Sequence, residues 1–354
     1  MPRTSFNREE LEISGYYPGF GPVNPGIPIL HTPITPRENL KRFILHDHPL
    51  WMPSFWEMKM FNPLVIPDNQ ARGMVLEAAV VSPEQFGGSD MFGIEWEFVP
   101  SVRGSIVRPG NPCLADVSDW RKKIAFPDFS KYDWAGCAER NQGYLDDPRA
   151  IQFTVFTGFF ERLISFVDMT DALISMIDED TQDVVKALFE RLADMYEELF
   201  PLVVKWFHPT LLWFHDDWGS QRAPFFSADT LKELLLPALK RTVAAAHKNG
   251  MGFEMHSCGK IEAMVPLMIE AGVDMWNGQD MNDKRTLYRE YGRDIALGVC
   301  PDPLPKEVTD TIIHDAARRF MDEYPENAYL GMAFTADTRI YTALYEESRR
   351  RCSA

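Results

Sequence analysis

The chain has 354 residues, of which 45% are hydrophobic and 25% charged, and this is the composition of a globular protein with material for a sizeable core. The 52 acidic residues outnumber the 36 basic ones, and the net charge of -16 argues against nucleic acid or an acidic membrane surface as a partner. A polar start and the lack of any apolar run approaching the ~20 residues that span a bilayer predict a cytoplasmic protein.

The first 35 residues are rich in Gly, Pro and aromatic side chains, a composition typical of an extended segment with repeated turns. We therefore expect residues 1–35 to form an N-terminal arm that packs on a single domain of residues 36–354. Such an arm is a candidate lid over an apolar or aromatic substrate. The aromatic candidates for contact with that substrate are Tyr16, Tyr17, Phe20 and Trp56.

From residue 36 onwards, short apolar stretches alternate with longer amphipathic ones. Helical periodicity marks the stretches 36–45, 182–207, 228–250, 261–273 and 310–324. Eight apolar stretches between or beside them are candidate strands, at 52–56, 92–99, 151–156, 211–215, 252–256, 273–277, 294–298 and 328–332. This alternation predicts an α/β fold, a closed (β/α)8 TIM barrel. A doubly wound open sheet is the alternative, although no G-x-G-x-x-G motif supports it.

Reactive side chains follow several of these predicted strands, and the site of a barrel lies at the carboxyl ends of its strands. His215, Asp216 and Asp217 come at the end of one strand, and Gln279 follows another. Since adjacent strand residues point to opposite faces, only one of the two aspartates is expected to face the barrel mouth. The other is equally well explained as a helix cap or as part of a salt bridge.

His256 and Cys258 are separated by one residue, so their side chains fall on the same side of an extended strand end. An imidazole and a thiolate suit zinc, and the five scattered cysteines are expected to be reduced. Cys300, about two β/α units later, is expected on the rim within reach of the same ion. Glu254 has the parity of His256 and is expected inside the barrel, as a further ligand or in a buried pair with a base. Alternatively, these residues are an ordinary core histidine and two buried apolar cysteines.

The stretch from HDDWG to HSCG and on to WNGQD, residues 215–280, resembles the uroporphyrinogen decarboxylase superfamily, in particular its corrinoid-dependent methyltransferase branch. The resemblance extends from PRENLKRFI near residue 36 to LGMAFTADT near residue 335. It implies a TIM barrel in which a His, a Cys and a later Cys hold zinc, and His256 and Cys258 match that motif. The decarboxylase itself has a basic RQAGRY-type element for its substrate carboxylates, where this chain has ISGYYPGFGPV.

The position of the third zinc ligand in the sequence distinguishes two subgroups of the methyltransferase branch. Members similar to thiol methylases carry their last cysteine near the eighth strand, where LGMAFTADT has none. Cys300 instead resembles the arrangement of members that demethylate aryl methyl ethers. The resemblance thus implies a zinc-dependent methyltransferase that passes a methyl group from a methoxylated aromatic substrate to cob(I)alamin on a separate corrinoid protein.

In that reaction Asp216, Asp217 and Glu254 are the candidate catalytic groups, and His215 and Gln279 are expected close to the substrate. Three alternatives stay open. They are a methylcobamide-to-thiol methyltransferase, a metal-free decarboxylase-like enzyme of the same superfamily, and a barrel that binds a ligand without turnover.

Overall fold

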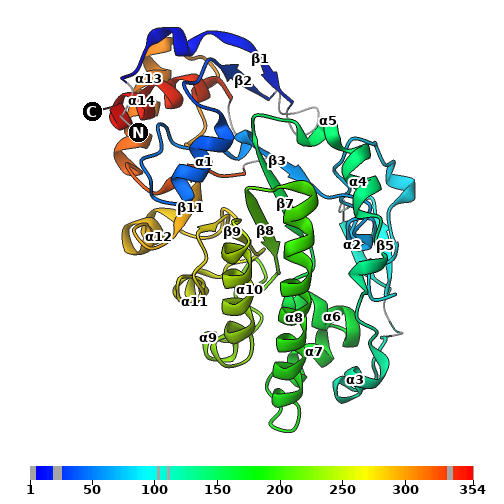
Figure 1. Cartoon of the computed structure of the whole chain (residues 1–354). Coiled ribbons are helices and arrows are strands. Elements are labelled where there is room, and N and C mark those ends of the chain that lie inside the picture. The colour runs from blue at the N-terminus through cyan, green and yellow to red at the C-terminus, as the bar shows by residue number, and fades with distance from the viewer. Residues whose placement is uncertain are drawn as a thin grey trace.

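The computed structural model describes residues 5–18, 26–101, 104–108, 110, 112–332 and 338–353. At its centre lies a parallel sheet that curls on itself, with its strands in chain order (Figure 1). The strands are β3 (Met58–Phe61), β7 (Ala150–Val155), β8 (Leu211–His215), β9 (Gly252–His256), β10 (Met275–Trp276), β11 (Ala296–Val299) and β12 (Ala328–Leu330). A bridge between Ser54 and Leu330 connects the run before β3 to β12, so the two edges of the sheet approach each other.

The predicted barrel strand at 92–99 is wrong. In the structure β5 (Glu95–Val99) pairs antiparallel with β4 (Gly88–Ser89) and β6 (Gly104–Val107) in a separate sheet. Along β5 the buried Trp96 stands between two exposed glutamates, the alternation of a sheet with one wet face. The described residues therefore form a TIM-like curled sheet of seven parallel strands, and the predicted closed eight-stranded barrel is correct only in part.

The first strand of the sheet, β3, begins at Met58 and not at residue 52 as predicted. Ser54 accepts a hydrogen bond from the Trp56 N–H, and Glu57 reaches back to accept one from the Ser54 N–H at 3.0 Å. This reciprocal capping starts a short 3-10 helix at Phe55–Glu57, and the strand begins only after it.

The five predicted helical stretches are helical in the structure, with one of them divided by a π-helical turn at Leu231–Leu235. Further short helices lie between them. The helices are α1 (Pro36–Ile44), α2 (Pro67–Ala71), α3 (Trp120–Lys123), α4 (Trp134–Arg140), α5 (Gln142–Leu145), α6 (Phe159–Val167), α7 (Met169–Ser175), α8 (Gln182–Phe207), α9 (Ala228–Thr230), α10 (Leu236–Lys248), α11 (Val265–Ala271), α12 (Lys284–Tyr291), α13 (Asp310–Glu323) and α14 (Tyr341–Ser353). No helix of the described residues is long and apolar enough to cross a membrane.

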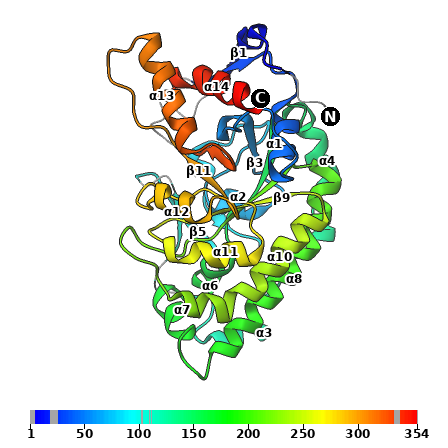
Figure 2. The ribbon, with the colours of Figure 1, turned by 90° about the vertical axis from the view of Figure 1, so that its left-hand side faces the viewer.

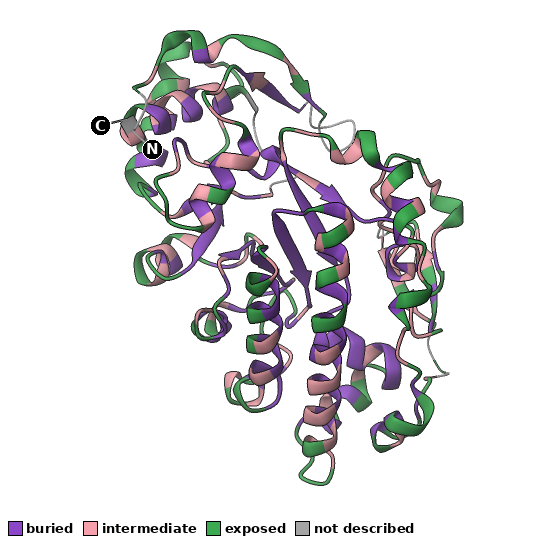
Figure 3. Ribbon diagram, viewed as in Figure 1, coloured by how far each residue is buried: buried purple, intermediate pink, exposed green. Residues whose placement is uncertain are grey.

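Two cores flank the curled sheet. Inside it, alternate strand residues such as Leu211, Trp213 and Met275 pack together with Leu40 and Phe43 of α1. Outside it, the other face of each strand packs against helices, with α8 and α10 lying side by side along β7 to β9 (Figure 1). Both helices are buried toward the sheet and exposed on the opposite side (Figure 3). Both faces of the sheet are thus packed, and a site can form at the carboxyl ends of the strands.

The described part of the arm is a hairpin rather than an extended segment. β1 (Ile13–Tyr17) and β2 (Ile27–Leu30) pair antiparallel and lie beside α14 (Figure 2). Preceding the hairpin, Glu10 accepts hydrogen bonds from the Tyr345 hydroxyl at 2.7 Å and from Arg349 at 3.0 Å, and all three side chains are buried. These contacts attach the arm to the last helix of the chain.

Candidate metal centre

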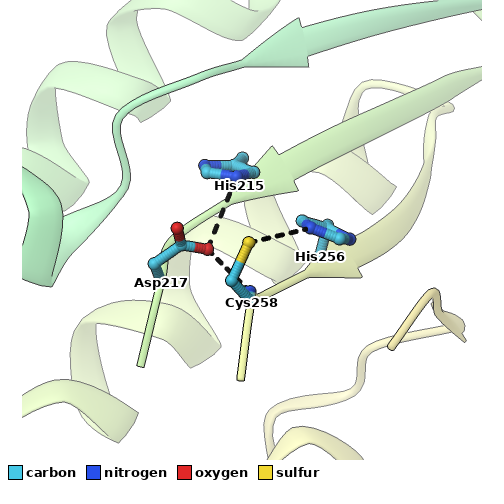
Figure 4. Close-up of side chains that lie close together, drawn as sticks. All are labelled: His215, Asp217, His256 and Cys258. Carbon is cyan, nitrogen blue, oxygen red and sulfur yellow. Dashed lines mark hydrogen bonds and ion pairs between the residues drawn. The ribbon is translucent and has the colours of Figure 1, made fainter. Parts of the chain in front are cut away.

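Two neighbouring strand ends bring four possible metal ligands together. His215 ends β8 and His256 ends β9, and the parallel register pairs these two residues directly. Their rings are nearly stacked, with centroids 5.1 Å apart and planes inclined by 17°. Asp217 and Cys258 follow the two histidines at the same spacing, so they reach the same point (Figure 4). One ligand atom from each of the four residues lies within 4.8 Å of all the others.

His256 is held with one ring nitrogen facing this group. Its Nδ1 donates to the backbone oxygen of Asn277 at 2.7 Å, which leaves Nε2 as the acceptor, 3.8 Å from the Cys258 Sγ. Burial, with the neighbouring His215 as the second cause, lowers the pKa of His256 to about 4. A neutral imidazole with a lone pair on Nε2 is the form that binds a metal ion.

His215 is held in the same manner by a carboxylate. Its Nδ1 lies 2.8 Å from Glu161 Oε2, and its Nε2 lies 3.5 Å from Asp217 Oδ1. Glu161 is in turn bound by Arg72 at 2.8 Å. Burial acts to lower the pKa of His215, but the carboxylates of Glu161 and Asp217 raise it well above its usual value. A carboxylate behind a histidine is the usual support for a metal-binding imidazole, because it fixes the ring orientation and the tautomer.

The loop after β9 is shaped to present Cys258. The Cys258 N–H donates to Asp217 Oδ1 at 2.6 Å, and the next N–H, of Gly259, donates to Gln279 Oε1 at 2.8 Å. Gly259 has a φ of +97°, and a Cβ there would lie 2.3 Å from the carbonyl carbon of Gly219, so only glycine fits. Gln279, predicted to lie near the substrate, thus holds the backbone beside Cys258. Burial raises the pKa of the Cys258 thiol, so a bound cation would be needed to hold it as thiolate.

The four residues fit a metal ion by their chemistry. Two imidazoles, a thiol and a carboxylate can supply nitrogen, sulfur and oxygen ligands, a set that favours zinc over magnesium or calcium. Both imidazoles already have their outer nitrogen occupied by a hydrogen-bond partner. Of the predicted ligands, His256 and Cys258 belong to this group, and the group also contains His215 and Asp217, which were predicted for other roles.

Cys300, the third predicted ligand, lies outside the group of four. It follows β11, and its Sγ is 3.8 Å from the backbone oxygen of Gly331. It lines a small cavity of about 30 Å³ together with Trp56. Its role as a ligand stays a prediction.

The sequence left open which of Asp216 and Asp217 faces the barrel mouth and which is a helix cap or part of a salt bridge. Asp216 is fully buried and accepts hydrogen bonds from the backbone N–H groups of Phe160 and Glu161 and from the Trp218 indole, so it caps α6. Burial raises the pKa of Asp216 to about 7. Asp217 is therefore the aspartate that faces the mouth.

Glu254 lies inside the curled sheet, as its parity with His256 predicts. Its carboxylate accepts hydrogen bonds from Gln152 of β7 at 2.5 Å and from the Tyr329 hydroxyl of β12 at 2.6 Å, and burial raises its pKa to about 7. It joins strands across the interior, and its partners are an amide and a phenol rather than a base.

The predicted substrate-binding aromatic residues lie in different surroundings. Tyr16 is 65% exposed, whereas Tyr17 and Trp56 are buried beside α14. Phe20 lies outside the described residues. The aromatic rings found next to the metal-ligand group are instead Phe156, 5.7 Å from the His215 ring, and Trp213, 5.3 Å from the His256 ring.

Sequence reasoning missed these two rings and the pair Glu161 and Arg72. Trp213 stands two residues before His215 on β8, so strand parity alone places it on the same inner face. Glu161 lies on α6, whose residues are almost all buried, and its ion pairs with Arg72 and His215 join segments far apart in the chain, so no local pattern points to them.

A cavity of about 490 Å³ opens beside the group of four. Asp217 and Glu161 line one part of it, and Trp96 and Ile106 of the antiparallel sheet line another. We refer to it as the Asp217 cavity. It provides the space in which a small substrate would meet the candidate metal centre.

Replacement of Glu161 with Gln is expected to weaken zinc binding about 10- to 100-fold, because an amide supports the His215 imidazole less well than a carboxylate does. Competition with a chromophoric chelator measures the change. Glu190→Gln is the control, since Glu190 also binds an arginine, Arg241 at 2.7 Å, but at the surface. Equal zinc affinity of the Glu161 and Glu190 variants would show that His215 is not a ligand.

No protein-family model and no curated protein sequence matches the chain. Among solved structures, a methyltransferase from Methanosarcina mazei is similar, with a TM-score of 0.61 and 12% identity over 88% of this chain and 97% of that chain. A xylose isomerase-like TIM barrel protein from Mycobacterium smegmatis matches with a TM-score of 0.31 and 12% identity, over 64% of this chain and 82% of that one. At 12% identity, the first likeness establishes a shared TIM-barrel-like fold.

Proposed function

We propose that the chain is a zinc-dependent methyltransferase that moves a methyl group from a methoxylated aromatic substrate to cob(I)alamin on a separate corrinoid protein. The observation that carries the proposal is the group of His215, Asp217, His256 and Cys258 at the carboxyl ends of β8 and β9. The likeness of the fold to that of the Methanosarcina mazei methyltransferase, together with the HSCG and DDWG motifs, supports methyl transfer over other chemistries of a metal-binding barrel.

Zinc in this position would serve as a Lewis acid on the ether oxygen, which makes the aryloxide a better leaving group. His256 and Cys258 would hold the ion, with His215 and Asp217 of the neighbouring strand beside them. Asn277 and Glu161 fix the two imidazoles from behind, so the side chains need little reorganisation on binding.

The surroundings of the group would orient an aromatic substrate. The rings of Phe156 and Trp213 lie against the two histidines and exclude water from the inner side of the centre. The Asp217 cavity gives the substrate its space on the other side. The chain would dock the corrinoid protein around the barrel mouth, because the methyl acceptor has to reach the same point as the donor.

The test is methyl transfer to cob(I)alamin from a panel of methoxylated aromatics, with transfer from methylcobalamin to a panel of thiols measured beside it, and the change in corrinoid absorbance follows both. Transfer from at least one aryl methyl ether, dependent on zinc, is the expected result. Transfer from methylcobalamin to a thiol alone would point to the thiol branch, and no transfer in either assay would overturn the proposal.

A metal-free enzyme is the second candidate, and one observation favours it. His215 lies between the carboxylates of Glu161 and Asp217, and a protonated His215 completes this ion network without any metal. Activity that survives exhaustive chelation would support this candidate against the first.

A further inference from the structure

The loop after β9, residues 257–261, is bound to its neighbours at each backbone N–H from 258 to 261, and we call it the Cys258 loop. These four N–H groups donate in turn to Asp217 Oδ1 at 2.6 Å, Gln279 Oε1 at 2.8 Å, the backbone oxygen of Ser220 at 2.8 Å and Asn282 Oδ1 at 2.9 Å. Backbone groups in a surface loop are often left to water. Here each of the four has a partner on the loop after β8 or on the loop after β10, so the protein itself fixes the path of the chain around Cys258.

One buried side chain joins the Cys258 loop to the loop after β10. Asn282, which is 3% exposed, accepts the N–H of Ile261. Its Nδ2 donates to the backbone oxygens of Gly259 at 3.0 Å and of Gln279 at 2.9 Å. Asn282 thus uses its acceptor and both of its donor N–H groups. A carboxylate or an alkyl side chain of similar size would leave some of these backbone groups unpaired.

The bonds on both sides of Gly259 restrict the direction of the Cys258 side chain. The Gly259 N–H is held by Gln279 and the Gly259 oxygen by Asn282, so neither of these two peptide groups rotates freely. The Cys258 oxygen accepts a hydrogen bond from the Ser257 hydroxyl at 3.0 Å. Because the backbone is held in this way, the thiol has only its χ1 rotation left, a torsion with a few staggered positions.

We propose that Asn282 is a positioning residue for the candidate metal centre, and that it holds the Cys258 loop in its metal-binding shape before any ion is present. Ordering a loop costs conformational entropy, and a loop that is ordered beforehand does not take that cost from the free energy of metal binding. Asn282 acts through the backbone of the loop and not as a ligand. The inference rests on the proposed function for the presence of zinc, but the order of the loop is a property of the protein without zinc.

The zinc affinity of two Asn282 variants, measured by competition with a chromophoric chelator, tests the inference. Asn282→Ala removes all three hydrogen bonds, and Asn282→Asp keeps the size and the acceptor but loses both donors. We expect each variant to bind zinc about 10- to 100-fold more weakly than the intact protein. The thiolate-to-cobalt(II) charge-transfer absorbance of the cobalt-loaded protein should weaken in parallel, because it reports the bond to Cys258 directly.

Asn39→Ala and Asn39→Asp are the matched controls. Asn39 of α1 is 1% exposed, donates to the backbone oxygen of Trp51 at 3.0 Å and accepts the Leu50 N–H at 2.7 Å. It therefore also joins two segments through backbone groups, but not at the loops of the candidate metal centre. Both sets of variants should lower the urea concentration at the midpoint of unfolding, and only the Asn282 set should lower zinc affinity. Asn282 variants that bind zinc as the intact protein does, or Asn39 variants that lose as much zinc affinity, would overturn the inference.

Hydrogen exchange of the intact, zinc-free protein tests the same point without a substitution. We expect the N–H groups of residues 258–261 to exchange slowly, and added zinc to slow them further by less than about tenfold. Protection that arises only with zinc would show that the ion orders the loop, and this would overturn the inference while the zinc-dependent reaction stands. No zinc binding by the intact protein would overturn both.

Discussion

Replacement of Cys258 with Ser is expected to lower zinc affinity by at least about 100-fold and methyl transfer by the same factor. The reason is that it removes the single sulfur ligand of the group of four. The fold should persist, since Cys258 is part of a loop held by backbone bonds to Asp217 and Gln279 and not of the core. Zinc affinity by chelator competition and cob(I)alamin methylation measure the two effects. Cys113→Ser, at an exposed cysteine, is the control and should change neither.

The same assays on Cys300→Ser decide between the two possible ligand sets. Loss of zinc in Cys258→Ser alone would support the group of His215, Asp217, His256 and Cys258. Loss in both variants would support the ligand that the family resemblance implies at Cys300. Methyl transfer that is unimpaired in both variants would contradict a zinc mechanism altogether.

Replacement of Arg162 with Met is expected to destabilise the fold by about 3 to 5 kcal/mol, because it leaves two buried carboxylates without their cation. Arg162 of α6 is fully buried and forms ion pairs with Asp68 of α2 and with Asp90, the latter at 2.5 Å. Asp90 also accepts the Trp96 indole N–H at 2.9 Å, so this cluster attaches the antiparallel sheet to α6. The free energy of unfolding in urea measures the loss.

Arg241→Met provides the comparison for Arg162. Arg241 also binds several carboxylates, among them Glu190 and Asp194, but on the surface between α8 and α10. Its removal should cost at most about 1 kcal/mol, since exposed ion pairs contribute little. Equal losses for the two variants would contradict the view that the buried cluster holds the wall of the Asp217 cavity in place.

The alternation of apolar and amphipathic stretches was enough to predict most of the curled sheet. The strands at 211–215 and 252–256 have the predicted bounds, because each is a short, largely apolar run that is buried on both faces. The prediction of a barrel strand at 92–99 is wrong because it rests on the apolar content of the stretch and not on the alternation of apolar and polar residues along it. Trp96 between two glutamates indicates a one-sided strand, and that signal was present in the sequence.

The site was predictable in part. Spacing on one strand led to His256 and Cys258, and strand parity led to Glu254 in the interior. The residues that β8 contributes to the site depend on the register between β8 and β9. This register pairs His215 with His256 and so brings Asp217 close to Cys258. Register between parallel strands is set by packing over long sequence distances, and no local pattern reveals it. Glu161 and Arg72 were out of reach for the same reason, because Glu161 meets His215, and Arg72 meets Glu161, through tertiary contacts alone.

The metal content of the purified protein tests the central claim most directly. We expect about one zinc ion per chain by elemental analysis, and we expect His256→Ala and Cys258→Ser to purify without it. Removal by chelation should abolish methyl transfer, and added zinc should restore it. A protein that carries no more zinc than its Cys258→Ser variant, and that binds none on titration, would contradict a metal centre at these strand ends.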